Sequence, residues 1–287
     1  MTSIFRSAGL AKASAALACV GALAAAVPAA ATGAFKFYIM VDLLNGADQL
    51  VMDRWYMTYH AQQMHRSMRA WQRNYISFRS YNTPPEADIY PIWHGRLSEI
   101  DYDSYADFQE GRANNPFLDI LTAPPGGWQR GAAILNAAEG AITPTAIFRS
   151  EPAAVPINPQ EVYLQGATPA KETPYFRWVV FFRYPKGVSQ ADGDKWFLGT
   201  HVKEVAKLPG LRRYIGYRVI DTESKYPRVE ELWFDDYKAW RKVFIGTQPA
   251  FTKPPWGGTR FPFADAISTF VGENPDIDFM NDKRVIP

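Results

Sequence analysis

Hydrophobic and polar positions along the chain follow two different spacings. Short runs rich in aromatic and β-branched residues, bounded by turn-forming residues, are typical of strands. Segments in which apolar residues recur every three or four positions are typical of helices that pack one face against a sheet. The spacings predict two series of elements, each in the order strand, helix, strand, strand, helix, strand. The predicted ranges are 35–43, 49–69, 73–80, 90–97, 105–112 and 141–149, and then 176–184, 190–207, 212–220, 229–234, 237–244 and 266–271.

The two series also match each other in sequence. Both first strands are rich in aromatic residues, and both first helices carry a tryptophan five residues before a histidine. Because the matches keep the same order along both halves, we interpret the chain as an internal duplication. The collinear matches are 35–40 with 176–181, Trp55 with Trp196, His60 with His201, 75–79 with 214–218, 92–93 with 232–233, Tyr105 with Tyr237, Phe108 with Trp240, and 124–127 with 254–258.

The order of elements in each series predicts an α+β fold. It is the β-α-β-β-α-β order of a ferredoxin-like unit, in which helices cover one face of the sheet and leave the other bare. A bare apolar face must be buried, and a second unit in the same chain can bury it. We therefore expect two ferredoxin-like units that form one fused dimeric α+β barrel. The expected organisation is a signal peptide at 1–31, an N-terminal unit at 34–150, a linker at 151–174, a C-terminal unit at 175–272 and a tail at 273–287.

The first 31 residues have the three regions of a secretory signal peptide. Arg6 and Lys12 precede an apolar stretch at 13–27, and a run of small residues follows at 29–31. The apolar stretch is shorter than the roughly 20 residues that span a bilayer, so cleavage is favoured over an uncleaved anchor helix. We expect a periplasmic or secreted protein that is free of the membrane after cleavage. Cys19, the single cysteine of the chain, lies in this leader, so the mature chain has no thiol for a disulfide, a nucleophile or a metal site.

Composition and charge narrow the class of partner. Hydrophobic residues make up 47% of the chain and charged residues 21%, which excludes disorder as the main state. The net charge of +2 comes from the two basic residues of the acid-free leader, so the mature chain is neutral overall. A neutral chain without a basic stripe is not typical of a nucleic-acid binder. We expect a small molecule as partner, and a second copy of the chain could join as a homodimer.

One segment of the C-terminal half resembles a known family. Leu208-Pro-Gly-Leu-Arg-Arg-Tyr214, which follows Trp196-x4-His201, resembles the EthD-like branch of the dimeric α+β-barrel superfamily. The resemblance extends over nearly all of 34–272, although the N-terminal half has Arg69-Ala70-Trp71 in place of Pro-Gly-Leu. It implies cavities between sheet and helices that host varied chemistry without a shared cofactor: polyketide cyclisation, anthrone oxygenation, isomerisation and lyase steps. Because distant relatives bind haem, function does not follow from the fold.

His60 and His201 are the leading candidate catalytic residues. They occupy the same position of the first helix in each half, on the stripe that faces the sheet. A histidine there can transfer protons to or from a phenol, enol or carbon acid. The alternative is a structural histidine that bonds a backbone carbonyl. His60 and His65 are five residues apart and lie on different faces of a helix, so we expect no metal site.

His94 distinguishes the two halves. It falls in the predicted third strand of the N-terminal unit, opposite in alignment to Phe234, and Trp93 beside it faces the other side of the sheet. Two histidines in one pocket can take separate acid and base roles. We therefore predict that the N-terminal pocket, with His60 and His94, is the active one.

Other side chains are candidates for weaker reasons. Tyr75 could orient a carbonyl or deliver a proton, or it could be a core residue. Asp42 and Arg183, at equivalent ends of the first strands, could bind substrate charges or pair with each other. Trp93 and Trp128 could stack on an aromatic substrate, while an anchored tryptophan in a rigid turn is the alternative for Trp128.

These observations predict an exported, cofactor-independent enzyme that uses histidine acid–base chemistry on an aromatic or polyketide-like small molecule, as a lyase, cyclase or isomerase. The reaction type is what the resemblance implies. One alternative is a haem protein of the peroxidase-like type with His60 or His201 as axial ligand. The other is a non-catalytic periplasmic module that binds apolar or phenolic ligands.

Overall fold

The computed structural model describes residues 35–43, 48–114, 122, 148–156, 163–166, 173–219 and 224–279. The predicted signal peptide, Trp128 and the Pro-Pro-Gly-Gly segment at 124–127 lie outside the described residues. Within the described ranges, every helix is too short or too polar to span a bilayer.

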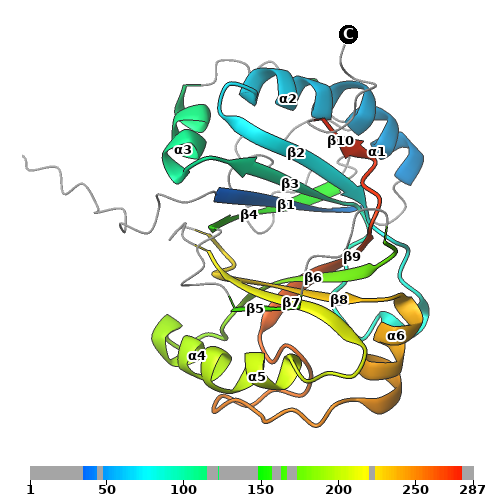
Figure 1. Ribbon diagram of the computed structural model, residues 1–287, viewed down its shortest axis with the longest axis vertical. Helices are drawn as coiled ribbons and strands as arrows, with labels where there is room; N and C mark the ends of the chain where they lie inside the picture. Colours follow the sequence, from blue (N-terminus) through cyan, green and yellow to red (C-terminus); the bar gives the residue numbers. More distant parts are fainter. Residues whose placement is uncertain are drawn as a thin grey trace, which may run out of the picture.

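Two antiparallel sheets lie face to face at the centre of the molecule, with helices on their outer sides (Figure 1). In the part that the structure describes, one sheet has the order β10-β2-β3-β1-β4 and the other β5-β7-β8-β6-β9. The fold is therefore α+β, with two ferredoxin-like units packed through their sheets, as predicted. The strands are β1 Phe35–Leu43, β2 Gln72–Arg79, β3 Arg96–Tyr102, β4 Phe148–Pro156, β5 Tyr163–Gln165, β6 Phe176–Arg183, β7 Leu211–Arg218, β8 Arg228–Phe234, β9 Asp265–Gly272 and β10 Ile277–Asp278.

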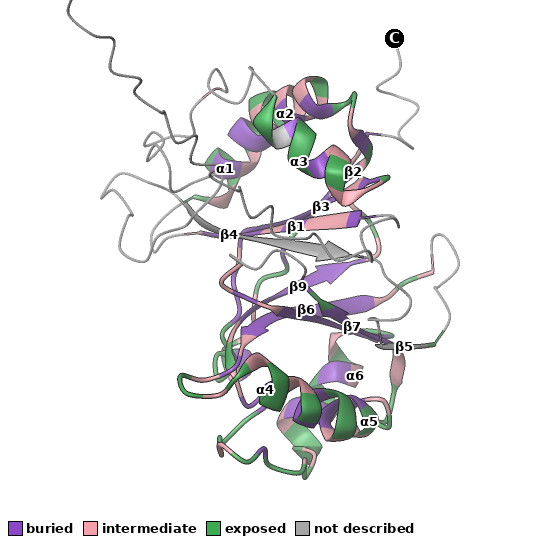
Figure 2. Cartoon of the chain, turned by 90° about the vertical axis from the view of Figure 1, so that its left-hand side faces the viewer, coloured by how far each residue is buried: buried purple, intermediate pink, exposed green. Residues whose placement is uncertain are grey.

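The helices cover the outer face of each sheet, and their buried sides point inwards (Figure 2). The first helix of each unit contains a π-helical segment that ends at its histidine, and each starts at a side-chain cap, Asp48 or Ser189. Both helices match their predicted ranges. The helical segments are α1 Gln49–Trp55, π-helical Tyr56–His60, α2 Ala61–Met68, the short 3-10 turn Pro85–Ala87, α3 Tyr105–Ala113, α4 Gln190–Trp196, π-helical Phe197–His201, α5 Val202–Val205, α6 Tyr237–Arg241 and π-helical Lys242–Thr247.

The segments expected to be linker and tail both contribute strands. β5 follows the N-terminal unit along the chain but pairs with β7 of the C-terminal unit. β10 follows the C-terminal unit but pairs with β2 of the N-terminal unit. Each unit thus completes the sheet of the other. Asp276, just before β10, also accepts a hydrogen bond from buried Arg96 at 2.6 Å.

The third strand of the N-terminal unit lies later than predicted. It spans Arg96–Tyr102, whereas the apolar alternation predicted 90–97. The residue opposite the start of β1 is Tyr102, and the residue opposite the start of β6 is Phe234. The counterpart of Phe234 is therefore Tyr102, not His94, and His94 lies outside the strand.

The residues before this strand are apolar for a different reason. Tyr90 and Ile92 belong to the core of the C-terminal unit, and the backbone N–H of Trp93 donates to the carbonyl of Ser268 at 2.7 Å. The apolar residues at these positions are therefore buried against the C-terminal unit, and they do not mark a strand of the N-terminal sheet. β3 itself carries several polar residues, so a search for apolar alternation passes over it.

The fourth strand of the N-terminal unit is also shifted, from the predicted 141–149 to Phe148–Pro156. β4 is an edge strand that pairs with β1. Proline is tolerated on an edge strand because the missing N–H can face away from the ladder. The predicted linker at 151–174, which was assigned from its proline content, therefore begins within the strand β4.

The facing sheets bury a small network of charged side chains. Arg177 on β6 forms ion pairs with Glu99 on β3, across the interface, and with Glu231 on β8 at 3.4 Å. Lys36 on β1 pairs with Glu99 at 2.9 Å, and the hydroxyl of Tyr38 donates to Glu231 across the interface. Two cations and two carboxylates make the network neutral.

The network has the same parts in both units. Strand register places Lys36 and Arg177 at equivalent positions, and likewise Glu99 and Glu231. Burial alone would raise the pKa of Glu99, but Arg177 and Lys36 lower it to about 2. The carboxylate is therefore ionised at neutral pH, and it depends on both cations.

Arg177→Met tests this dependence. The substitution leaves Glu99 and Glu231 buried with Lys36 as their one cation in the network, and we expect the free energy of unfolding to fall by about 3–5 kcal/mol. Urea denaturation measures this loss. The control is Arg73→Met, because Arg73 pairs with Asp103 at the surface, and such pairs contribute at most about 1 kcal/mol. Equal losses in the two variants would show that the buried network does not hold the sheets.

Candidate active site

A histidine, a glutamate and a tyrosine meet between the helices and the sheet of the C-terminal unit. Nε2 of His201 lies 3.0 Å and 3.2 Å from the two carboxylate oxygens of Glu230. The hydroxyl of Tyr214 on β7 donates to Oε2 of Glu230 at 3.1 Å. His201 is 1% exposed and Glu230 is 0% exposed, so the pair is removed from water.

The alternation of β8 explains how Glu230 reaches this place. Neighbouring residues of a strand point to opposite faces, so Glu231 points between the sheets and Glu230 points towards the helices. Gly216 on β7, opposite Glu230, leaves room there: a Cβ atom would lie 3.2 Å from the ring of Phe197. The register of β8 therefore fixes the direction of both carboxylates.

Aromatic rings enclose the imidazole of His201. Phe197 and Phe261 stack on it with centroid distances of 5.4 Å and 5.2 Å, and Trp196 lies at 4.8 Å. An ionised carboxylate can only accept hydrogen bonds, so Nε2 of His201 is the donor to Glu230. In the neutral imidazole that makes this bond, the lone pair lies on Nδ1. Nδ1 is buried and has no hydrogen-bond partner among the described residues.

The segment at 248–264 lies against this cluster. It contains no helix or strand, and it places Phe251 and Phe261 beside the imidazole. Thr252 bonds Glu204 through its N–H at 2.9 Å and its hydroxyl at 2.6 Å. Trp256 packs on Trp196 and donates to the carbonyl of Phe263 at 2.7 Å, so it is an anchored residue of a turn.

The equivalent place in the N-terminal unit has no carboxylate. Ser98 stands where Glu230 stands in the other unit, and its hydroxyl lies 2.5 Å from that of Tyr56. Tyr56 also bonds the hydroxyl of Tyr75 at 2.7 Å. His60 stacks on Trp55 at 4.8 Å, and burial lowers its pKa to about 4. His60 is therefore neutral at neutral pH.

The structure places the remaining candidates at several different sites. Nδ1 of His94 lies 3.0 Å from the hydroxyl of Thr83, and its backbone N–H donates to Asp42 at 2.9 Å. Trp93 packs in the core between the sheets. Arg183 pairs with Asp265 at 3.4 Å near the surface. Asp42 thus contacts His94, while Trp93 contributes to the barrel interior.

The sequence analysis missed Glu230, which contributes most to the site. Its signal was the Glu230-Glu231 pair inside a strand that is otherwise apolar from Val229 to Phe234. Two adjacent carboxylates in a buried strand must point to opposite faces, and each needs a partner there. Arg177 and Glu99 were missed as well, because they pair across the interface between the two sheets, and local sequence patterns do not predict such a contact.

Comparisons with known proteins find structural neighbours at low sequence identity. No family model and no curated protein matches the chain. A candidate monooxygenase from Lactobacillus acidophilus is 13% identical, with a TM-score of 0.36 over 85% of this chain and 95% of that one. An anthrone oxidase-like protein is 13% identical, with a TM-score of 0.44 over 86% and 92%. Chlorite dismutase from Candidatus Nitrospira defluvii in complex with imidazole is 8% identical, with a TM-score of 0.43 over 84% and 91%.

At such low identities the similarity concerns the fold alone. The EthD-like branch and the internal duplication stay predictions.

The partly buried His60 predicts a pH dependence of stability. Its pKa is about 4 in the folded chain and near 6.5 when unfolded, so the unfolded state binds more protons between these values. The free energy of unfolding should therefore fall as the pH drops from 6.5 to 4, with about 1–3 kcal/mol due to His60. Urea denaturation of wild type and His60→Phe across this range isolates the contribution. Parallel pH profiles for the two proteins would contradict it.

Proposed function

We propose that the protein is an exported enzyme in which His201 acts as general base on an aromatic or polyketide-like small molecule. The observation that supports it most is the position of Nδ1 of His201, which is buried without a hydrogen-bond partner in the described residues while Nε2 is held by Glu230. A base held in this way needs no reorientation before it accepts a proton.

The roles of the three side chains follow from their hydrogen bonds. Nδ1 of His201 takes a proton from a phenol or from a carbon next to a carbonyl, and the ring becomes an imidazolium. The carboxylate of Glu230 stabilises that cation, as the carboxylate of a catalytic triad does. Tyr214 holds the second oxygen of Glu230. Return of the proton to another atom gives isomerisation, and loss of a leaving group gives a lyase step, so no cofactor is required.

The surrounding rings support an aromatic substrate. Phe197, Phe251 and Phe261 offer apolar faces beside the imidazole, on which a flat ring can stack. Because His201 is 1% exposed, the substrate must displace the segment at 248–264 to reach it. The bonds between Thr252 and Glu204 lie at the surface, where breaking them costs little.

A pocket around His60 and His94 is the rival site within the same function. His60 is a weaker base, because burial lowers its pKa to about 4 and Ser98 offers no negative charge to stabilise an imidazolium. His94 lies on a loop and contacts Thr83, so it is not held by the strand that was predicted to carry it. These contacts favour the C-terminal unit for the base.

The haem alternative fits His201 poorly. An axial ligand must be accessible to the porphyrin, but Nε2 of His201 is bonded to Glu230, Phe197 and Phe261 stack on the imidazole, and His201 is 1% exposed. A Soret band in the purified protein would favour haem at His60. The binding-module alternative differs from an enzyme only in turnover.

The proposal predicts a hierarchy of variants. Wild type is incubated with a panel of phenols and 1,3-dicarbonyl aromatics, and mass spectrometry finds the substrate by its conversion. On that substrate, His201→Gln should lower turnover by about 10²-fold or more, and Glu230→Gln by at least about tenfold, since each removes part of the base. His60→Phe and His94→Phe are the matched controls and should keep turnover within about twofold.

Melting temperatures separate catalytic loss from unfolding. Loss of turnover in His60→Phe and His94→Phe, with His201→Gln active, would place the base in the N-terminal unit. If wild type binds compounds of the panel and converts none of them, the enzyme proposal fails and a binding module is the function.

A further inference from the structure

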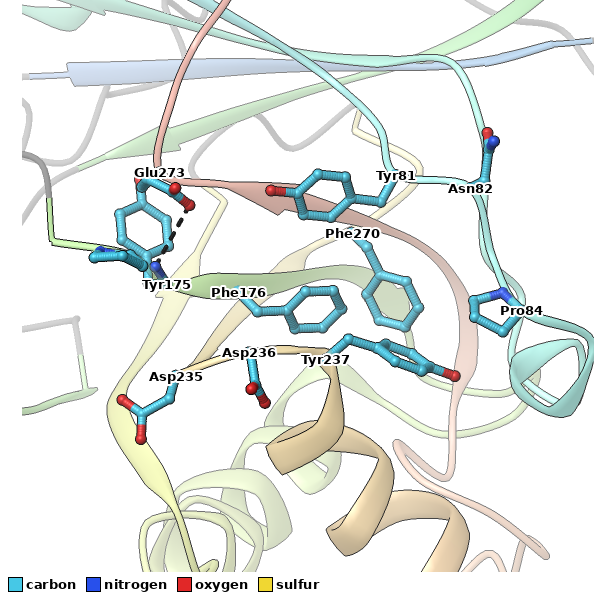
Figure 3. Close-up of a pocket in the computed structure, with 11 residues that line it drawn as sticks. Tyr81, Asn82, Pro84, Tyr175, Phe176, Asp235, Asp236, Tyr237, Phe270 and Glu273 are labelled. Atoms are coloured by element: carbon cyan, nitrogen blue, oxygen red, sulfur yellow. Dashed lines mark hydrogen bonds between the residues drawn. The ribbon is translucent and has the colours of Figure 1, made fainter.

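A cavity separate from the His201 cluster lies where the two units meet. Its volume is about 460 Å³, within the range of small-molecule sites. The loop after β2 forms one wall, and the other walls come from the ends of β6 and β9 and the start of α6 (Figure 3). Neither His201, Glu230 nor Tyr214 lines it.

Aromatic rings from both units line this cavity. Tyr81, from the N-terminal unit, stacks nearly parallel to Phe176, with an angle of 7° and a centroid distance of 6.0 Å. Phe270 and Tyr237, from the C-terminal unit, also contact Phe176, at 4.7 Å and 5.7 Å (Figure 3). The faces of such rings carry partial negative charge and attract cations.

The charged groups that line the cavity are all acidic. Glu273 lies beside Tyr175, whose N–H it accepts at 3.5 Å, and Asp235 and Asp236 lie near the same end (Figure 3). Arg212, outside the cavity, neutralises Asp235 at 3.2 Å. Among the described residues, the lining of the cavity contains no lysine, arginine or histidine, so these residues give it a negative net charge.

We propose that this cavity binds an organic cation, an ammonium group on a small apolar frame. The rings of Tyr81 and Phe176 contact the cation and its apolar groups, and Glu273 supplies the opposite charge. Metal cations suit the cavity less well, because rings and prolines form most of its wall and metal sites of this type need several oxygen ligands. The bound cation would contact both the loop after β2 and the C-terminal unit. Binding in this cavity does not depend on catalysis at His201.

Calorimetric titration with choline tests the proposal against its neutral isostere, 3,3-dimethylbutan-1-ol. The two probes have nearly the same shape and differ in charge, so we expect choline to bind at least about threefold more tightly. Tyr81→Leu removes a ring face and Glu273→Gln removes a charge, and each should weaken choline binding by at least about threefold. Tyr81→Phe keeps the ring and should keep the affinity.

Two control variants match these changes at distant positions. Tyr59→Leu removes a tyrosine of similar exposure, 47% against 45% for Tyr81, and Glu110→Gln removes an exposed carboxylate. Both should bind choline as wild type does. Equal binding of the two probes, absence of choline binding, or equal weakening by the control variants would overturn the proposal.

Discussion

The burial of four charged side chains between the two sheets constrains how the sheets meet. Lys36 and Glu99 come from one unit, and Arg177 and Glu231 come from the other. Each sheet carries one cation and one carboxylate, and Arg177 links the two pairs because it also reaches Glu99 across the interface. A buried ion pair adds little net stability but penalises alternatives that leave a charge unpaired. The exchange of β5 and β10 between the units reinforces the same arrangement.

This arrangement also decides which residues face the helices. Once Glu231 points between the sheets, Glu230 must point towards His201. The N-terminal unit has the inner glutamate, Glu99, but carries Ser98 at the outer position. The glutamate between the sheets is thus present in both units, as Glu99 and Glu231. The glutamate beside a histidine, Glu230, is present in the C-terminal unit alone among the described residues. A chain with two similar units can hold its barrel together with both and keep a buried carboxylate–histidine pair in one.

The sequence predicted the order of elements and the equivalence of His60 and His201, because both depend on local spacing. It misplaced β3, because the burial of residues 90–93 comes from the other unit, and periodicity does not say which partner buries a residue. β10 was missed for a similar reason: two residues in a tail become a strand only because an edge of β2 is available. The partners of Glu230 and Glu231 come from other elements of the fold, so the sequence does not predict them, although the two adjacent glutamates are visible in the strand.

The central claim is that Glu230 holds His201 with its lone pair on Nδ1. Long-range proton–nitrogen correlation NMR of protein labelled with ¹⁵N at the imidazoles reports the tautomer directly, with His201→Gln to assign the signal. The account predicts that His201 at neutral pH is the neutral tautomer protonated at Nε2, and that Glu230→Gln alters its spectrum. A proton on Nδ1, in the other tautomer or in an imidazolium, would contradict the account.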